Sequence, residues 1–244
     1  MSATRGDVCA LACADLFAAD GEVLASPMAP VPMIGARLAR LTHSPDLLMS
    51  DGEAYLLADT PPLGGASPIE GWIPYRKVFD VVAAGTRHVV MGANQLDRYG
   101  NQNISCFGPH DKPTRQMFGV RGGPGNTINH RTSYWVPKHS ARVFTAAVDM
   151  VSGVGWDRAT GTAAKYFDLY RVVSNLGVFD FGGPGHAMRV VSAHPGVELD
   201  EIVAQTGFEL ATEGAGVTRE PTPEELELIN SLDPKGVRNK EVGE

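Results

Sequence analysis

The chain has 244 residues, of which 43% are hydrophobic and 20% are charged, and its formal net charge is −7. This is the composition of an ordinary globular protein long enough to bury one good α/β core. The acidic balance argues against general affinity for nucleic acid, because phosphate backbones reward basic surfaces, and no apolar run approaches the roughly 20 residues that cross a bilayer.

The first residues and the cysteines indicate a cytoplasmic protein. Residues 1–7 lack the basic-then-apolar order of a secretion signal. Three cysteines are an odd and sparse set, which is typical of reduced intracellular thiols. Cys9 and Cys13 share one face of a helix, but no further metal ligands stand nearby. We therefore expect both to pack in the core, and we expect no metal site.

Apolar residues recur at helical spacing in three segments near the start of the chain. The predicted helices cover residues 7–19, 33–41 and 75–84. A proline-rich loop joins the first two, and residues 60–74 are interpreted as a surface loop. Residues 47–49 form a short buried strand that ends in Ser50-Asp-Gly-Glu53. Chemistry in α/β proteins is commonly placed at such carboxyl ends of parallel strands.

Strand signals dominate the remainder of the chain. The predicted strands cover residues 88–92, 143–151, 170–174, 178–181 and 188–192. A polar turn at 95–103 follows the first, a loop is expected from 119 to 139, and a helix is expected over 198–206. The pattern Thr222-Pro-Glu-Glu225 predicts a capped amphipathic helix, and the polar residues beyond Pro234 are expected to be loose. Strands alternating with helices predict an α/β fold with an open, mostly parallel sheet flanked by helices.

The segment 119–126, Gly-Val-Arg-Gly-Gly-Pro-Gly-Asn, is the most suggestive stretch. Glycines let a ligand approach the main chain closely, and successive free N–H groups can hold a phosphate or a developing oxyanion. Spacing alone favours an ordinary loop with glycines at its turns. The local charge points the other way, because residues 110–142 contain six Lys or Arg against one acid, Asp111. The segment therefore suggests a small polyanionic ligand.

Other candidates each have a structural explanation as well. His130 and His139 stand in the basic segment and could meet a ligand or lie on the surface. Asp51 and Glu53 could share acid/base work, although solvated turn carboxylates are commoner. Neutral amides in glycine-rich turns could donate to a thioester carbonyl or an enolate, but turn chemistry also selects Asn. These amides belong to Asn94, Asn101, Asn103 and Asn126.

Several segments together resemble the β subunits of class I coenzyme A transferases. The stretch Ala93-Asn-Gln-Leu-Asp-Arg-Tyr-Gly-Asn-Gln-Asn103 is similar to the G-A-x-Q-[IVL]-D-x-x-G-N-x-N pattern of that family. Gly122-Gly-Pro-Gly-Asn126 stands where those proteins have a second glycine loop. Ala193-His-Pro-Gly-Val197, followed by Thr206-Gly-Phe208, resembles their C-terminal signature. The resemblance implies that family's α/β fold over the predicted domain, residues 1–213. The amphipathic helix and tail predicted above then cover residues 214–244.

One departure from that family concerns the chemistry. The early strand of the transferases ends in S-E-N-G, and its glutamate attacks the acyl-CoA. Alignment on Gly52 puts Ser50 in the place of that glutamate and Asp51 in the place of the asparagine. A serine hydroxyl is a poor nucleophile without a base beside it, and its acyl ester does not exchange as an anhydride does. We therefore predict that transferase activity is absent.

The segment 119–144 resembles one subgroup in particular, the β subunits of actinobacterial cholesterol ring-cleaving hydrolases (IpdB type). The resemblance implies an α2β2 heterotetramer with a homologous α subunit. It implies hydrolytic carbon–carbon cleavage of the last steroid ring, a cyclohexenone that carries a carboxyl-CoA thioester. The acid/base glutamate is expected from the α subunit. No cofactor is expected, since coenzyme A is part of the substrate.

This chain would then supply walls and oxyanion donors, and no residue in it is assigned a certain catalytic role. The catalytic candidates are Ser50 and Asn103. The candidate donors to the substrate are Gly122, Gly123, Asn126 and Asn94. Two alternatives stay open: a 3-oxoacid-type CoA-transferase β subunit in which Asp51 or Glu53 replaces the family glutamate, and a non-catalytic structural partner.

Overall fold

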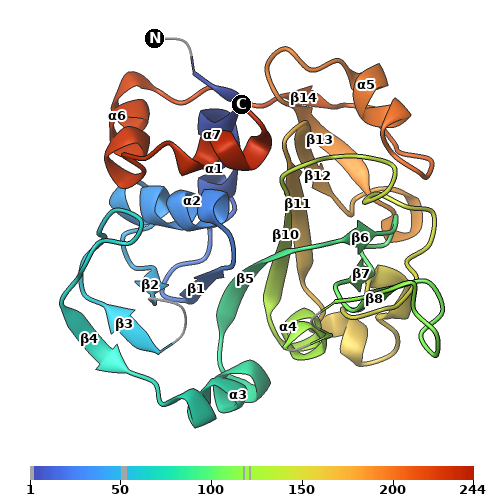
Figure 1. Ribbon diagram of the computed structural model, residues 1–244, viewed down its shortest axis with the longest axis horizontal. Coiled ribbons are helices and arrows are strands. Elements are labelled where there is room, and N and C mark those ends of the chain that lie inside the picture. The colour runs from blue at the N-terminus through green and yellow to red at the C-terminus, as the bar shows by residue number, and fades with distance from the viewer. Residues whose placement is uncertain (1–2, 51–53, 118, 121) are drawn as a thin grey trace.

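The computed structural model describes residues 3–50, 54–117, 119–120 and 122–244. Its centre is an eight-stranded sheet in the order β14-β13-β12-β11-β10-β5-β1-β2 (Figure 1). The strands are β1 (Leu24–Pro27), β2 (Leu48–Met49), β5 (Arg87–Gly92), β10 (Arg131–Val136), β11 (Leu169–Ser174), β12 (Gly177–Asp180), β13 (Arg189–Ala193) and β14 (Gly216–Val217). Neighbouring strands are parallel except in the pairs β11–β12 and β12–β13. The predicted open, mostly parallel α/β sheet is confirmed.

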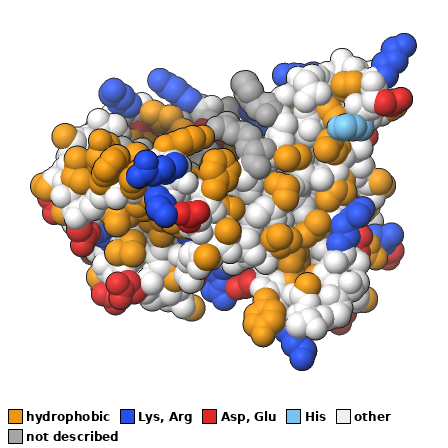
Figure 2. Space-filling model, turned by 90° about the horizontal axis from the view of Figure 1, so that it is seen from below, with side chains coloured by type: hydrophobic (Ala, Val, Ile, Leu, Met, Phe, Trp, Pro, Cys, Tyr) orange, Lys and Arg blue, Asp and Glu red, His pale blue; other side chains and the backbone are white. Residues whose placement is uncertain are grey.

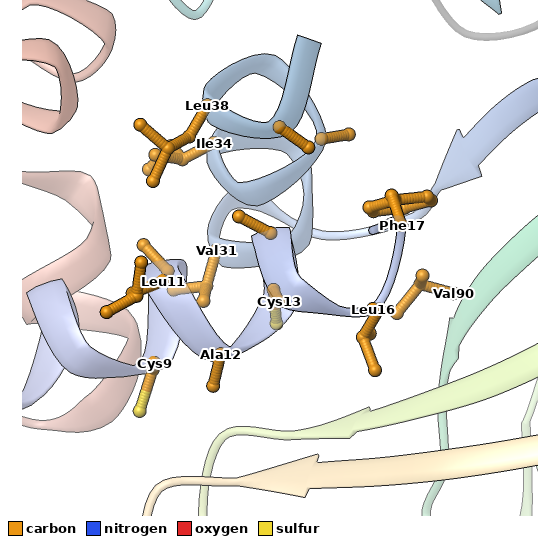
Figure 3. Packing of buried hydrophobic residues seen from close by; sticks show 14 of the residues in the cluster. Cys9, Leu11, Ala12, Cys13, Leu16, Phe17, Val31, Ile34, Leu38 and Val90 are labelled. Carbon is orange, nitrogen blue, oxygen red and sulfur yellow. The ribbon is translucent and has the colours of Figure 1, made fainter. Parts of the chain in front are cut away.

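Four helices cover one face of this sheet (Figure 1). They are α1 (Arg5–Asp15), α2 (Pro30–Leu41), α6 (Pro223–Leu232) and α7 (Val237–Val242). Leu11 of α1 and Ile34 of α2 pack in one core with Val90 of the sheet (Figure 3). The two helices approach closely at Gly35, where an added Cβ would lie 2.6 Å from the Cβ of Cys13. A larger residue there would force the helices apart.

Short elements and irregular chain cover the opposite face. They are the hairpins β6–β7 (Gln95–Leu96, Gln102–Asn103) and β8–β9 (Cys106–Phe107, Arg115–Gln116), the helices α4 (Gly123–Asn129) and α5 (Leu199–Ala204), and the 3-10 turns η1 (Trp156–Arg158), η2 (Ala163–Lys165) and η3 (Pro184–His186). A second core lies under them; it includes Met91, Leu96, Tyr134, Phe144 and Phe179. The polar turn and the glycine segment of the sequence both belong to this side.

One part of the chain stands away from the sheet. The hairpin β3–β4 (Tyr55–Leu57, Ile69–Trp72) leads into α3 (Tyr75–Ala84), a helix with no buried residue. The side chains of Ile69, Trp72, Tyr75 and Phe79 are 58–76% exposed, and we call these four residues the β4–α3 face. Figure 2 shows hydrophobic side chains gathered on this side of the molecule. Large exposed apolar surface of this kind marks contact with another molecule.

The residues beyond Pro234 form α7, which corrects the expectation that they are loose. Arg238 of this helix is 5% exposed. Its Nε donates to Asp7 Oδ1 at 2.6 Å, and its Nη1 donates to Asp233 Oδ2 at 3.1 Å. A buried charge needs such partners, and these bonds fasten α7 to α1. The domain boundary at residue 213 stays a prediction.

Most of the predicted elements are confirmed. Helices are present at 7–19, 33–41, 75–84, 198–206 and 222–232, and strands at 47–49, 88–92, 170–174, 178–181 and 188–192, with ends that shift by a few residues. The capping box of Thr222 and Glu225 has both of its hydrogen bonds. Cys9 and Cys13 are fully buried in the first core, as expected.

The prediction of a loop over 119–139 is wrong, because this stretch contains α4 and the central strand β10. The polar residues of β10 find partners inside the protein. Thr132 Oγ1 donates to the carbonyl of Asn126 at 3.1 Å, and Ser133 Oγ lies 2.9 Å from His88 Nε2. A strand whose hydroxyls are paired in this way needs no continuous apolar run.

Three further predictions fail for related reasons. The strand predicted over 143–151 is absent, since only Phe144 joins a β-bridge, with Leu96. Val143 and Phe144 instead pack into the second core, and Ala146 and Ala147 are exposed in the turns that follow. Strand β1 lies in the proline-rich loop, where Pro27 ends the strand, and part of the 60–74 loop forms β4.

Candidate active site

Ser50 stands at the carboxyl end of β2, at one edge of the sheet. The β1–β2 register pairs Ala25 with Met49, so Ser50 follows beside Ser26 of the neighbouring strand. Ser50 is half-buried and bridges to Leu56. Asp51, Gly52 and Glu53 lie outside the described residues, and with them the hypothesis that an acid replaces the transferase glutamate.

Arg87 is a buried cation that the sequence reasoning missed. It opens β5, is 3% exposed, and donates from Nη2 to Asn126 Oδ1. Its Nη1 also reaches Ser26 Oγ, at 3.4 Å. Arg87 therefore connects Ser26 of β1 to Asn126 of α4. An arginine two positions before the apolar run Val89-Val-Met91 is the one signal that could have revealed it.

The glycine segment folds as the start of α4 rather than as an open loop. Gly122 is the N-cap, and the Gly123 N–H donates to the carbonyl of Val120 at 2.9 Å. That N–H is therefore occupied within the chain. Of the basic residues around the segment, Arg131 pairs with Asp20 and Asp168 at the amino end of β10. Phe118 and Arg121 lie outside the described residues.

Asn103 is committed to its own hairpin. It is fully buried, and its Nδ2 donates to Gln95 Oε1 and to the carbonyl of Cys106, both at 2.7 Å. Its Oδ1 accepts the N–H of Ser105 at 2.9 Å. Both amide hydrogens are thus used, which favours a structural role. Its candidacy as a catalytic residue stays a prediction that this geometry does not support.

Asn94 is placed differently. It is exposed at the carboxyl end of β5, and its Nδ2 lies 3.0 Å from Met117 Sδ. A thioether sulfur is a weak acceptor, so this amide keeps most of its donor capacity. Met117 precedes the glycine segment, and the structure therefore brings Asn94 next to that segment, as the donor hypothesis requires.

The histidines that sequence alone could not interpret are buried. His139 stacks on Phe144 with 3.8 Å between ring centroids, and its ring nitrogens lie 3.0 Å from Ser174 Oγ and from Thr206 Oγ1. His194, from the C-terminal signature, contacts Thr218 Oγ1 at 3.0 Å and the carbonyl of Ser174 at 2.9 Å. Burial lowers the pKa of His139 to about 3 and that of His194 to about 4. Both are neutral core residues at pH 7.

This pair makes the stability depend on pH. The unfolded chain takes up a proton at each histidine below about pH 6.5, whereas the folded protein does so only near pH 3 to 4. We therefore expect the free energy of unfolding to fall as pH drops from 6.5, by about 1.4 kcal/mol per pH unit for each histidine. Urea unfolding of His194→Asn between pH 4.5 and 8 should show a shallower slope than wild type. An unchanged slope would contradict the prediction.

A cavity of about 340 Å³ opens at the amino ends of β5 and β10. Asp20, Arg87, His88, His130, Arg131 and Asp168 belong to its lining. His130 is 4% exposed, and neither ring nitrogen has a hydrogen-bond partner among the described residues. Burial, and next the charge of Arg87, lower the pKa of His130 to about 4. This imidazole is neutral at pH 7.

In the described part of the chain, no group of three His, Cys, Asp or Glu side chains could hold a metal ion. No helix in the same residues has the length and apolar content to cross a membrane.

The chain is similar over its full length to proteins of one kind. It is 64% identical over 243 residues to the cholesterol ring-cleaving hydrolase IpdB subunit of Rhodococcus jostii (strain RHA1), across 98% of this chain and 96% of that relative. A chain in the crystal structure of Rhodococcus jostii RHA1 IpdAB matches with a TM-score of 0.97 and 62% identity, across 100% of both chains. Glutaconate coenzyme A-transferase from Acidaminococcus fermentans shares the fold, with a TM-score of 0.82 at 20% identity across 99% of this chain and 98% of that one. No family model matches the chain.

Proposed function

This chain belongs to the family of IpdB subunits of cholesterol ring-cleaving hydrolases, and on that premise we propose that it is the β subunit of a heteromeric hydrolase. The complex opens the last steroid ring by hydrolytic carbon–carbon cleavage of a cyclohexenone carboxyl-CoA thioester. The observation that carries this proposal is 64% identity over 98% of the chain. Ser50, where a transferase would have its glutamate, supports hydrolysis over group transfer.

The reaction needs an activated water and a place for negative charge. A carboxylate of the α subunit takes a proton from water as the water oxygen bonds to the ring carbonyl carbon. The adduct then breaks its carbon–carbon bond, and the electron pair moves through the α carbon onto the thioester oxygen as an enolate. The proton returns to that carbon, which leaves a ring-opened carboxylate with its CoA thioester intact.

This chain contributes neutral donors and space to that scheme. An oxyanion donor typically lowers the barrier by roughly 3–4 kcal/mol. Asn126 and Asn94 are the candidates whose amides rest on weak sulfur acceptors, at 3.2 Å and 3.0 Å. Ser50 is smaller than a glutamate, so its place leaves room for a ring at the carboxyl end of β2.

The assembly we propose is an α2β2 heterotetramer in which the α subunit covers the β4–α3 face. Two observations support this position. The chain passes from Ser50 through three residues outside the described ones and then directly into β3 and β4. A partner that delivers a carboxylate to Ser50 therefore has to lie close to this hairpin. Helix α3 buries no residue in this chain. Its apolar side chains would be buried against such a partner.

We further propose a cytoplasmic enzyme that needs no cofactor. The three cysteines are free and buried, which suits a reducing compartment. Water and a carboxylate are sufficient for the proposed steps, and coenzyme A enters as part of the substrate.

The test is co-expression with the α-type subunit of the same organism, followed by assay on cyclic enone CoA thioesters. We expect ring opening by the complex and none by either subunit alone. After incubation with acyl-CoA, hydroxylamine or borohydride should trap no covalent CoA thioester on this chain. A trapped thioester would identify a CoA-transferase instead. Full activity of the α subunit without this chain would leave it no part in the reaction.

A further inference from the structure

Arg87 dictates the direction of the Asn126 amide. Both residues are 3% exposed. A guanidinium can only donate hydrogen bonds, so the group of Asn126 that faces Arg87 Nη2 has to be the carbonyl oxygen, Oδ1. The NH2 group then necessarily points away from Arg87. The main chain of Asn126 is held as well, since its N–H donates to the carbonyl of Gly122 at 2.9 Å.

The NH2 group points toward a weak partner and an open space. Its nitrogen, Nδ2, lies 3.2 Å from Met91 Sδ, which is a poor acceptor. Gly122 stands on its other side. If Gly122 carried a Cβ, that atom would lie 3.8 Å from Asn126 Nδ2, and no other heavy atom of the described residues, its chain neighbour Gly123 aside, would lie within 4 Å of it. Among these residues, glycine at position 122 thus leaves room beside the buried amide donor.

We propose that Arg87 is a positioning residue that holds Asn126 Nδ2 toward the space beside Gly122, where it receives the oxygen of the substrate's thioester. The proposal rests on the proposed function and names the donor and its support. A donor fixed in advance stabilises charge in the transition state without reorganising. An amide that could rotate would also present its carbonyl oxygen, which would repel an enolate.

Asn126→Asp tests the donor function of this side chain apart from its acceptor function. The aspartate keeps an acceptor for Arg87, and in fact a charged one, so the fold should hold. It replaces the donor with an oxygen that carries negative charge. In the purified αβ complex we expect kcat to fall by about 10²–10³-fold, with the thermal unfolding midpoint near that of wild type. A stable Asn126→Asp complex with kcat within threefold of wild type would overturn the proposal.

Gly122→Ala tests the space without touching the donor. Gly122 has φ −83° and ψ 0°, a turn conformation with negative φ that alanine can also adopt, so the variant should fold normally. Its methyl group would lie 3.8 Å from Asn126 Nδ2 and would crowd an oxygen bound to that amide, so kcat/KM should drop at least tenfold. Gly216→Ala is the matched control, because Gly216 is exposed on β14 and an added Cβ meets only Val191 O at 3.9 Å. Unchanged kcat/KM in Gly122→Ala would also overturn the proposal.

Two substitutions at Arg87 test the positioning role. Arg87→Lys keeps a cation that only donates, so Asn126 Oδ1 should still face it. Arg87→Gln can donate or accept, so the Asn126 amide can turn over. We expect Lys to retain at least tenfold more kcat than Gln. Equal losses in complexes of equal stability would mean that Arg87 serves the fold alone.

These outcomes stay distinct from a failure of the proposed function. An inactive wild-type complex rejects the hydrolase assignment, whatever the variants do. An active wild-type complex with active Asn126→Asp and Gly122→Ala variants rejects only the positioning of Asn126.

Discussion

Replacing Arg238 with methionine should lower the free energy of unfolding by about 3–5 kcal/mol, the range seen when one partner of a buried ion pair is removed. Arg238 is 5% exposed and serves two carboxylates, Asp7 and Asp233, whose side chains are 6% and 1% exposed. Methionine fills much of the same volume, so the loss arises from two buried carboxylates left without their cation. Urea unfolding of the free chain and of the complex measures the effect.

Arg189→Met is the matched control. Arg189 also pairs with an aspartate, Asp180, at 2.7 Å, but its side chain is 44% exposed. Solvent-exposed pairs contribute little, so stability should stay close to wild type. If Arg238→Met proved as stable as this control, the proposed fastening of α7 to α1 would be wrong.

The double variant Trp72→Glu/Phe79→Asp should abolish assembly with the α subunit. Both side chains belong to the β4–α3 face and are 65% and 58% exposed. Aromatic anchors at the centre of an interface contribute about 2–4 kcal/mol each. The double variant replaces each of them with a carboxylate that the interface would bury without a partner. We expect at least a thousandfold weaker association and a loss of turnover at ordinary protein concentrations. Size-exclusion chromatography of the mixed subunits gives the readout.

Because Trp72 and Phe79 make little contact inside this chain, the double variant should fold as well as wild type. Val217→Asp is the control, since Val217 is 75% exposed on β14 at the far edge of the sheet. It should leave binding of the α subunit unchanged. A double variant that still forms an active complex would move the α subunit to another surface.

The elements that sequence predicts well are those whose signals lie within a few residues. The capping box at Thr222 and Glu225 spans a single turn, and α6 begins where that box predicts. β10 fails this test, because Ser133 is buried against His88, which lies 45 residues earlier. No pattern within the Arg-Thr-Ser-Tyr-Trp-Val stretch reveals that partner, so the stretch was interpretable as a loop.

The candidate site follows the same division. The sequence resemblance predicted the family correctly. It also indicated Ser50 and Asn126, because each belongs to a short motif in the sequence. It could not reveal the role of Arg87, because that role depends on a hydrogen bond to Asn126, 39 residues away. Nor could it show that the amide of Asn103 donates to two oxygen acceptors, whereas the amides of Asn94 and Asn126 contact only weak sulfur acceptors. That difference arises from which acceptors the folded chain places beside each side chain.

The bond between Asp7 and Arg238 has a consequence for synthesis of the protein. The two residues are 231 positions apart in the chain, and a ribosome makes them in that order. The Asp7 carboxylate of α1 is therefore without the Arg238 cation for nearly the whole of translation. Until Arg238 is made, the helical layer that contains α1 and α7 is incomplete. The nascent chain is therefore open to chaperones and proteases for as long as elongation lasts.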